Sequence, residues 1–164
     1  MPNYQGVWSL STQYQNAGAW PRPPGPRALV GGGFLNSSLN TIEYFDIATD
    51  GNATDFGDLT VARYGLAAFS SATRGVFHSG YNTNTIDYVT IASTGNAADF
   101  GDAIAASWSK GGMSNSTRGV VSAGTRAASP YYYNTIEYNT IATLGNSLDF
   151  GDQTRTKTAT TSLA

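Results

Sequence analysis

The sequence predicts an all-β protein built from three copies of one short unit, and three observations carry this prediction. The letters NTIEY at residues 40–44 return as NTIDY at 84–88 and as NTIEY at 134–138. Each copy is followed by DFGD, with 14 positions separating the Ile of the first motif from the Phe of the second. Charged residues make up only 12% of the chain, and 19 Gly with many Ser, Thr and Asn favour turns and short strands over helices.

The first segment, residues 1–26, does not repeat. It carries the aromatic residues Tyr4, Trp8, Tyr14 and Trp20 in a polar context and ends in the Pro-rich run WPRPPGP. Pro-rich segments act as extended, semi-rigid spacers, and Trp and Tyr are favoured anchors in the pockets of a partner. We therefore predict an attachment arm whose four aromatic residues dock onto a partner. The alternative is that they cover an open end of the repeats.

The remaining residues, 27–164, are predicted to form one β domain of three units, approximately 27–73, 74–117 and 118–164. In the middle copy, GVFHSG is a small-residue strand, TIDYVTIAS is a β-branched and aromatic strand, and AADFGDA is a brief further strand. The letters STGN between the last two are turn residues. YGLAAFSSAT predicts the strand that opens the next unit, which gives four strands per unit.

The strand TIDYVTIAS is apolar on both faces. Ile86 and Tyr88 share one face and Ile91 lies on the other, because successive side chains alternate across a strand. A strand of this kind has to be covered on both faces. The pattern therefore favours small sheets stacked on one another over a sandwich with one face in solvent.

The order of an Arg, a short strand, Gly residues and N-x-hydrophobic-acid-Tyr resembles a blade of the kelch-type β-propellers. The Gly pair is intact in ALVGGG, whereas the later copies read HSGY and SAGT, and the Phe of DFGD replaces the second aromatic residue of the kelch pattern. The resemblance covers residues 27–164. It implies three kelch-like four-stranded repeats that form a partial β-propeller.

The count of strands indicates an offset between the two ends of the domain. ALVGGG is preceded by no copy of YGLAAFSSAT, and TRTKTATTSLA stands where that strand would follow the third DFGD. Propellers close their rings with such an offset, but they have typically 4–8 blades. We therefore expect the offset strand to pair between chains, so that two chains complete a six-bladed ring. A larger ring, or an open stack covered by other proteins, is the alternative.

The acidic residues argue against an active site, and we expect no catalytic residue, no metal and no cofactor. Nine of the eleven acids occupy three repeated columns: Glu43, Asp87, Glu137; Asp55, Asp99, Asp149; Asp58, Asp102, Asp152. A catalytic carboxylate pair has two different environments, whereas acids copied into every unit are expected to cap turns or to pair with the repeated Arg27, Arg74 and Arg118. His78 has no counterpart in the other units and no catalytic motif beside it.

Two familiar motifs are excluded in the same way. DFG occurs three times without the other kinase motifs. The stretch from Asp50 to Asp58 spaces oxygen ligands as calcium loops do, but it lacks the Glu of such loops, and Asp50 is replaced by Thr94 and Leu144 in the other copies.

The loops of variable length are the best candidates for recognition. They carry Tyr81, Tyr131, Tyr132 and Tyr133, and Tyr offers contact area and a polar tip at little cost in conformational entropy. The alternative is that these loops are plain solvent-exposed or inter-subunit loops. A net charge of −2 predicts no binding of nucleic acid, and no apolar run approaches the ~20 residues that membrane insertion needs.

The stretch GVWSLSTQYQNAGAWP resembles the short start of many tailed-bacteriophage virion proteins, and NTIDYVTIASTGNAADFGD resembles repeats of marine bacteriophage structural proteins. The two resemblances imply a structural protein of the virion (tail, fibre or capsid-associated) whose partners are copies of itself and other virion proteins. An alternative is a receptor- or glycan-binding module at the virion surface, with a host surface glycan as its partner. A propeller-type glycan hydrolase is a weaker alternative, because the acids are repeated.

Overall fold

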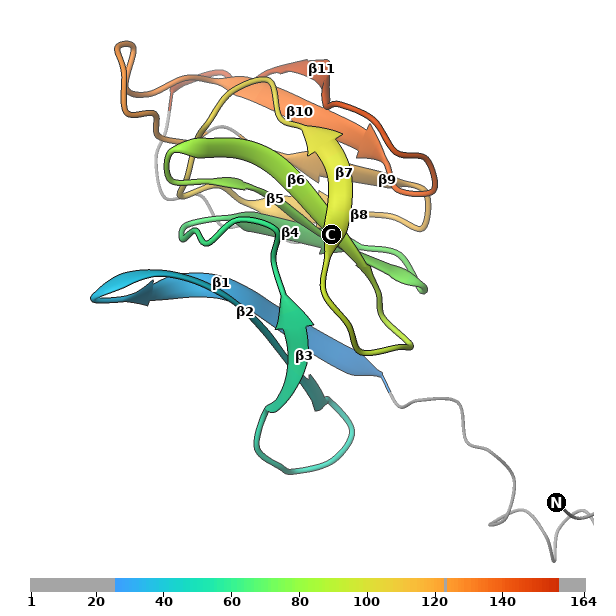
Figure 1. The fold of residues 1–164 in the computed structure, drawn as a ribbon. Coiled ribbons are helices and arrows are strands. Elements are labelled where there is room, and N and C mark those ends of the chain that lie inside the picture. The colour runs from blue at the N-terminus through green and yellow to red at the C-terminus, as the bar shows by residue number, and fades with distance from the viewer. Residues whose placement is uncertain (1–25, 123, 157–164) are drawn as a thin grey trace, which may run out of the picture.

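The protein is all-β in the residues that the structure describes. The structure is a computed structural model, and it describes residues 26–122 and 124–156. These residues form eleven strands in three antiparallel sheets, which confirms the all-β part of the predicted fold class (Figure 1). Within this part of the chain, no helix is long and apolar enough to cross a membrane.

Each sheet is a meander in which strands that follow one another in the sequence lie side by side. The first sheet consists of β1 (Arg27–Leu35), β2 (Ser37–Asp46) and β3 (Thr54–Asp58). The second consists of β4 (Ala67–Ser70), β5 (Arg74–Gly80), β6 (Thr83–Thr90) and β7 (Ala98–Asp102). The third consists of β8 (Gly112–Ser114), β9 (Arg118–Val121), β10 (Thr135–Thr140) and β11 (Leu148–Asp152).

The expectation of four strands per unit holds for the second and third sheets but not for the first. Strands β4 and β8 pair with β5 and β9. Strand β1 is the counterpart of β5 and β9, but within the described residues it pairs only with β2, so the first sheet has three strands. This difference follows the sequence, in which no copy of YGLAAFSSAT precedes ALVGGG.

The three sheets are stacked in chain order, with the second sheet between the other two (Figure 1). One core cluster joins the first and second sheets and contains Ile42, Phe56, Leu59, Phe77 and Val89. The other joins the second and third sheets and contains Ala67, Phe69, Val76, Ile86, Phe100, Ala103, Val121 and Ile141. Strand β6 contributes to both clusters, so the prediction that this strand is covered on both faces is confirmed.

The DFGD motif makes a β-bulge at the same place in every sheet. The registers shift directly after Ile42, Ile86 and Ile136, each of which lies opposite the Gly of a DFGD motif. These glycines have φ between +134° and +145°, a region that L side chains rarely adopt. The motif therefore places a bulge at the same point of every sheet, and Phe56 and Phe100 beside it pack in the cores between neighbouring sheets.

Candidate assembly site

The two contacts between stacked sheets share one set of interactions. We call the contact of the first and second sheets the first junction, and that of the second and third sheets the second junction. At the first junction, the guanidinium of Arg27 lies 4.6 Å from the ring centre of Tyr44 and donates a hydrogen bond of 3.0 Å to the carbonyl of Ile91. At the second junction, Arg74 lies 4.4 Å from the Tyr88 ring centre and donates over 2.7 Å to the Ile141 carbonyl.

A backbone clamp ties each of the first two DFGD motifs to the turn of the next sheet. The amide of Gly95 donates to the carbonyl of Phe56 over 2.7 Å, and the amide of Ala97 donates to the carbonyl of Asp58 over 2.8 Å. In return, the Asp58 amide donates to the side-chain oxygen of Asn96 over 3.1 Å. The three bonds satisfy backbone groups at a sheet edge that solvent would otherwise have to satisfy.

The second junction repeats this clamp. Its three bonds join Gly145 to Phe100, Ser147 to Asp102, and the Asp102 amide to Asn146, at 2.8, 2.8 and 2.9 Å. A Cβ added to Gly101 would lie 2.6 Å from the Gly145 carbonyl. Glycine at this position therefore permits both the positive φ and the close approach of the two backbone segments.

The acid column also acts across the junctions, but not with the repeated arginines. Asp87 accepts hydrogen bonds from the amide and hydroxyl of Thr60, which follows β3, and pairs with Arg63 at 2.8 Å. Glu137 accepts a bond of 3.0 Å from the amide of Ile104, which follows β7. The prediction that acids bind turn amides is confirmed at these two positions.

The predicted pairing of the acids with the repeated Arg27, Arg74 and Arg118 is wrong. All three guanidinium groups lie over Tyr rings, the last at 4.5 Å from the ring centre of Tyr138. The cationic partner of Asp87 is instead Arg63, which is fully buried and also donates to the carbonyls of Val61, Phe77 and Ser79.

His78 lies in a buried polar network at the second junction, outside any open cleft. Its Nε2 atom lies 2.9 Å from the hydroxyl of Ser147, and its Nδ1 atom lies 3.1 Å from Nζ of Lys110. The Glu137 carboxylate lies 3.6 Å from the imidazole and 4.0 Å from the ammonium. The Ser147 hydroxyl donates in turn to Asn139.

Burial sets the protonation of this network. Complete burial, together with the nearby Lys110 ammonium, lowers the pKa of His78 well below its ordinary value of 6.5. Burial lowers the pKa of Lys110 from 10.5 to about 8, although the Glu137 carboxylate acts in the opposite direction. The imidazole is therefore neutral at pH 7, and the network serves as a polar part of the junction core.

The two outer faces of the stack carry the same residue columns, and no other sheet of the described residues covers them. We call the outer face of the third sheet the trailing face, formed by Arg118, Tyr138, Phe150, Gly151 and Asp152. Its Phe150 is 52% exposed, whereas the equivalent Phe56 and Phe100 at the junctions are each 2% exposed. A Cβ on Gly151 would meet no atom within 4 Å, in contrast to Gly101.

The outer face of the first sheet carries the other half of the junction. We call it the leading face, formed by Val30, Glu43, Ile47, Gly51, Asn52 and Ala53. Ile47 is 66% exposed, whereas the equivalent Ile141 at the second junction is 1% exposed. Glu43 is exposed, although the equivalent Asp87 and Glu137 are buried. The described residues thus expose two complementary half-junctions at opposite ends of the stack.

Three of the four predicted loop tyrosines are at the surface. Tyr131 and Tyr132 are exposed, and Tyr81 is partly exposed. Tyr133 is buried and contacts the guanidinium of Arg126 at 3.8 Å, so it does not reach the surface with its neighbours. Tyr81 belongs to a row of neighbouring aromatic rings that begins on β1 and continues along the connections before β4, between β5 and β6, and before β8: Phe34, Tyr64, Tyr81, Trp108.

The predicted docking residues Tyr4, Trp8, Tyr14 and Trp20 lie outside the described residues. Sequence reasoning missed the buried roles of Arg63 and Lys110, because neither is copied between units. The DFGD column, in contrast, could have identified Phe150 as the free counterpart of two buried residues. Within the described part of the chain, no group of three or more His, Asp or Glu residues could hold a metal ion.

Comparison with protein-family models and with curated protein sequences found no match to this chain.

Proposed function

We propose that this protein is a non-catalytic structural component of a bacteriophage particle. Its three sheets would act as kelch-like blades of a partial β-propeller that assembles with copies of itself. Residues 1–26 would attach this body to other virion proteins. The observation that carries the proposal is the pair of unmatched half-junctions on the leading and trailing faces.

The geometry of the stack supports a propeller-like body. The strands β4 and β8 contact one another, and a Cβ on Gly112 would clash with the Ala68 backbone. Inner strands of neighbouring blades meet in this way around a propeller axis. Each added sheet would continue the same arrangement, because the junction contacts are copied from one pair of sheets to the next.

The use of the polar residues supports a structural role. The carboxylates of Asp87 and Glu137 accept hydrogen bonds from turn amides and pair with buried cations at the junctions. His78 is fully buried among such groups. These side chains hold sheets together, and a buried network of this kind favours one register over others.

The composition of virus particles tests this function. Particles would be purified from the source of the gene by density gradient and digested for mass spectrometry. Peptides of this chain in constant ratio to the major capsid protein are expected. Recovery of the chain only in the soluble fraction of infected cells would contradict a role in the virion.

A receptor- or glycan-binding module at the particle surface is a second candidate, favoured by the aromatic loops. Tyr131 and Tyr132 are exposed side by side, and the row that contains Tyr81 lies among loops of the same domain. Exposed rings of this kind stack on sugars and peptides with little loss of entropy. Binding on a glycan array that is lost in Tyr131→Ala and Tyr132→Ala variants would promote this candidate, and an array without signal would remove it.

A further inference from the structure

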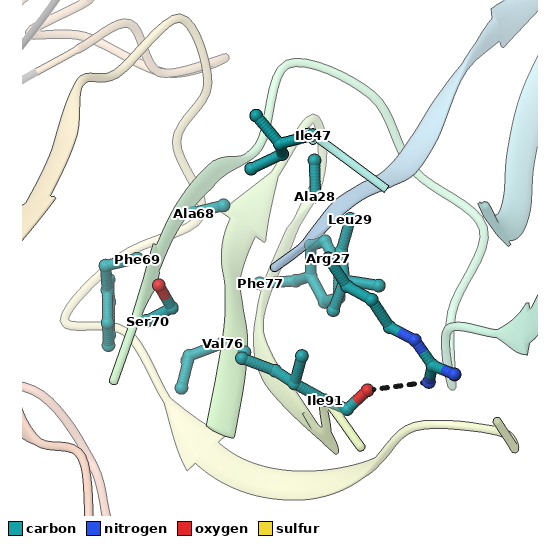
Figure 2. Close-up of a pocket in the computed structure, with 11 residues that line it drawn as sticks. Arg27, Ala28, Leu29, Ile47, Ala68, Phe69, Ser70, Val76, Phe77 and Ile91 are labelled. Carbon is teal, nitrogen blue, oxygen red and sulfur yellow. Dashed lines mark hydrogen bonds between the residues drawn. The ribbon is translucent and has the colours of Figure 1, made fainter. Parts of the chain in front are cut away.

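The first sheet has a free edge that borders a groove. Strand β1 pairs with β2 on one side only, within the described residues. Beside its other edge lies a groove of about 330 Å³. Figure 2 shows that groove, lined on one wall by Arg27, Ala28 and Leu29 and on the other by Ala68, Phe69 and Ser70.

The groove lies where an inner strand would complete the first sheet. In the second sheet β4 occupies the corresponding place beside β5, and in the third sheet β8 occupies it beside β9. Alternate residues of β4 support this interpretation. Ala67 and Phe69 are buried against the third sheet, whereas Ala68 and Ser70 are exposed toward the groove. An unpaired strand edge beside an apolar groove is a site for strand addition.

We propose that a second copy of this chain binds head to tail, with its trailing face on the leading face of the first copy in the register of the internal junctions. This interface rests on the proposed self-assembly and specifies the partner and its orientation. Each expected contact copies a bond that exists at one or both of the junctions within one chain.

The internal bonds fix the expected contacts. Arg118 of one copy takes the role of Arg74, with the Ile47 carbonyl of the other copy as acceptor in place of that of Ile141. The Gly51 amide binds the Phe150 carbonyl, as Gly145 binds Phe100. The Ala53 amide binds the Asp152 carbonyl, and the Asp152 amide binds the side chain of Asn52, in the pattern of the internal clamps.

The acid of the leading face completes the match. Glu43 is exposed in the chain, while the equivalent Asp87 accepts two bonds from Thr60, two positions after the DFGD of the preceding sheet. In the second copy that position is Thr154, whose amide and hydroxyl are the donors that Glu43 lacks within the described residues of its own chain. Burial of the exposed Ile47 and Phe150 side chains at the same contact would stabilise the complex further through the hydrophobic effect.

The segment after Asp152 supplies the strand for the groove. Strand β4 begins nine positions after Asp58, and β8 begins ten positions after Asp102. The same count after Asp152 leads to residues 161–164, which lie outside the described residues. In the assembly, this segment of one copy would add to the free edge of β1 in the other.

A second copy is favoured over other occupants because the two end faces match each other residue by residue. The Arg, Phe, Gly and Asp pattern of the trailing face is specific to this chain and is not expected on the surface of an unrelated protein. A head-to-tail contact is heterologous, so it produces a ring where the rotation closes and a filament where it does not.

Single cysteines test the interface directly, because the chain contains none. The variants Asn52→Cys and Asp152→Cys would be mixed in equal amounts and treated with a short bis-maleimide. We expect a covalent dimer linking residue 52 to residue 152 in the mixture and little dimer from either variant alone. The double variant Asp58→Cys with Asn96→Cys is the positive control, since these residues meet inside one chain.

The outcomes separate the interface from the proposed function. Oligomers without the 52–152 link, or dimers from either single variant alone, would overturn the register. A chain that stays monomeric and begins to associate when residues 1–25 are removed would identify its own arm as the occupant and overturn the second copy. The presence of the chain in purified particles is a separate measurement, so a failed link leaves the virion role standing, and a linked protein absent from particles leaves the interface standing.

Removal of residues 157–164, which keeps Thr154 and with it the expected contact to Glu43, tests the strand addition separately. We expect this truncation to abolish self-association while the body remains β by circular dichroism. A truncated chain that assembles as well as the full chain would show that the groove is not filled by this segment.

Discussion

Truncation of equivalent phenylalanines separates junction packing from the open end face. Phe100 and Phe150 occupy the same place in the DFGD motif, and each makes an edge-to-face contact with a Tyr ring, at 6.0 and 6.1 Å between centroids. Phe100 is 2% exposed within the second junction, whereas Phe150 is 52% exposed. The two substitutions therefore remove the same atoms from a covered and from an uncovered copy of one site.

The expected losses of folding free energy differ several-fold. Truncation of a fully buried Phe to Ala costs about 3–5 kcal/mol, so Phe100→Ala should lower the free energy of unfolding by about 4 kcal/mol. In the isolated chain, Phe150→Ala removes mainly the contact with Tyr138, worth about 1 kcal/mol. Urea unfolding followed by Trp fluorescence, at a concentration where the chains are monomeric, would measure both losses.

The remaining part of the Phe150 contribution should appear in association. The difference between the two losses, about 3 kcal/mol, corresponds to a dimer that is ~150-fold weaker in Phe150→Ala. Sedimentation across a dilution series would measure this change. Equal losses of unfolding free energy in the two variants, with unchanged association, would refute the reasoning, because Phe150 would then already be covered within one chain.

Three further predictions concern the junctions. Replacement of Arg63 by Met should lower the free energy of unfolding by about 3–5 kcal/mol in urea titrations, because it leaves the Asp87 carboxylate buried and unpaired; a loss below 1 kcal/mol would contradict it. Folding lowers the pKa of Lys110 from 10.5 to about 8, so the folded protein releases this proton at a lower pH than the unfolded chain does. The stability of the natural protein relative to a Lys110→Met variant should therefore rise by at most about 3 kcal/mol as pH increases from 8 toward 10.5. A difference in melting temperature that stays constant between pH 8 and 9.5 would contradict this prediction. Gly101→Ala should destabilise the chain far more than Gly151→Ala, because both glycines have positive φ but only the first has a backbone within 2.6 Å of the new Cβ; similar melting temperatures would exclude the contact as the cause.

Much of the fold could be predicted from the sequence because the same strand and turn motifs recur three times in the chain. The β-branched and aromatic letters of TIDYVTIAS define a strand, and its two apolar faces require cover on both sides, which β6 receives. The bulge could not be predicted from alternation alone. It depends on a positive φ at the Gly of DFGD, which the letters permit but do not require.

The partners of the charged residues were harder to predict. Repetition suggested that acids and arginines copied in every unit bind each other. Arg74 instead extends past Tyr88 to a carbonyl of the next sheet, while Asp87 receives the unrepeated Arg63 from the connection before β4. A long Arg side chain can reach several hydrogen-bond acceptors, so the fact that an Arg recurs in each unit does not tell which acceptor it binds.

The candidate site followed only in part from the sequence. The expectation that the outermost sheets need cover matches the exposure of Ile47 and Phe150. Only the three-dimensional structure identifies which backbone and side-chain atoms form the bonds that the end faces would copy. The loop tyrosines also required the structure, because Tyr131 and Tyr133 are neighbours in one motif and yet one is exposed and the other buried.

The mass of the protein in solution tests the central claim most directly, namely that the two end faces of the stack bind each other. Native mass spectrometry of the full chain over a dilution series should give two or more times the 17.2 kDa of a single chain, and twice that mass if two chains close a ring of six sheets. The Phe150→Ala variant should shift the population toward the single chain. A mass of 17.2 kDa at every concentration, for the natural protein as for the variant, would contradict the account.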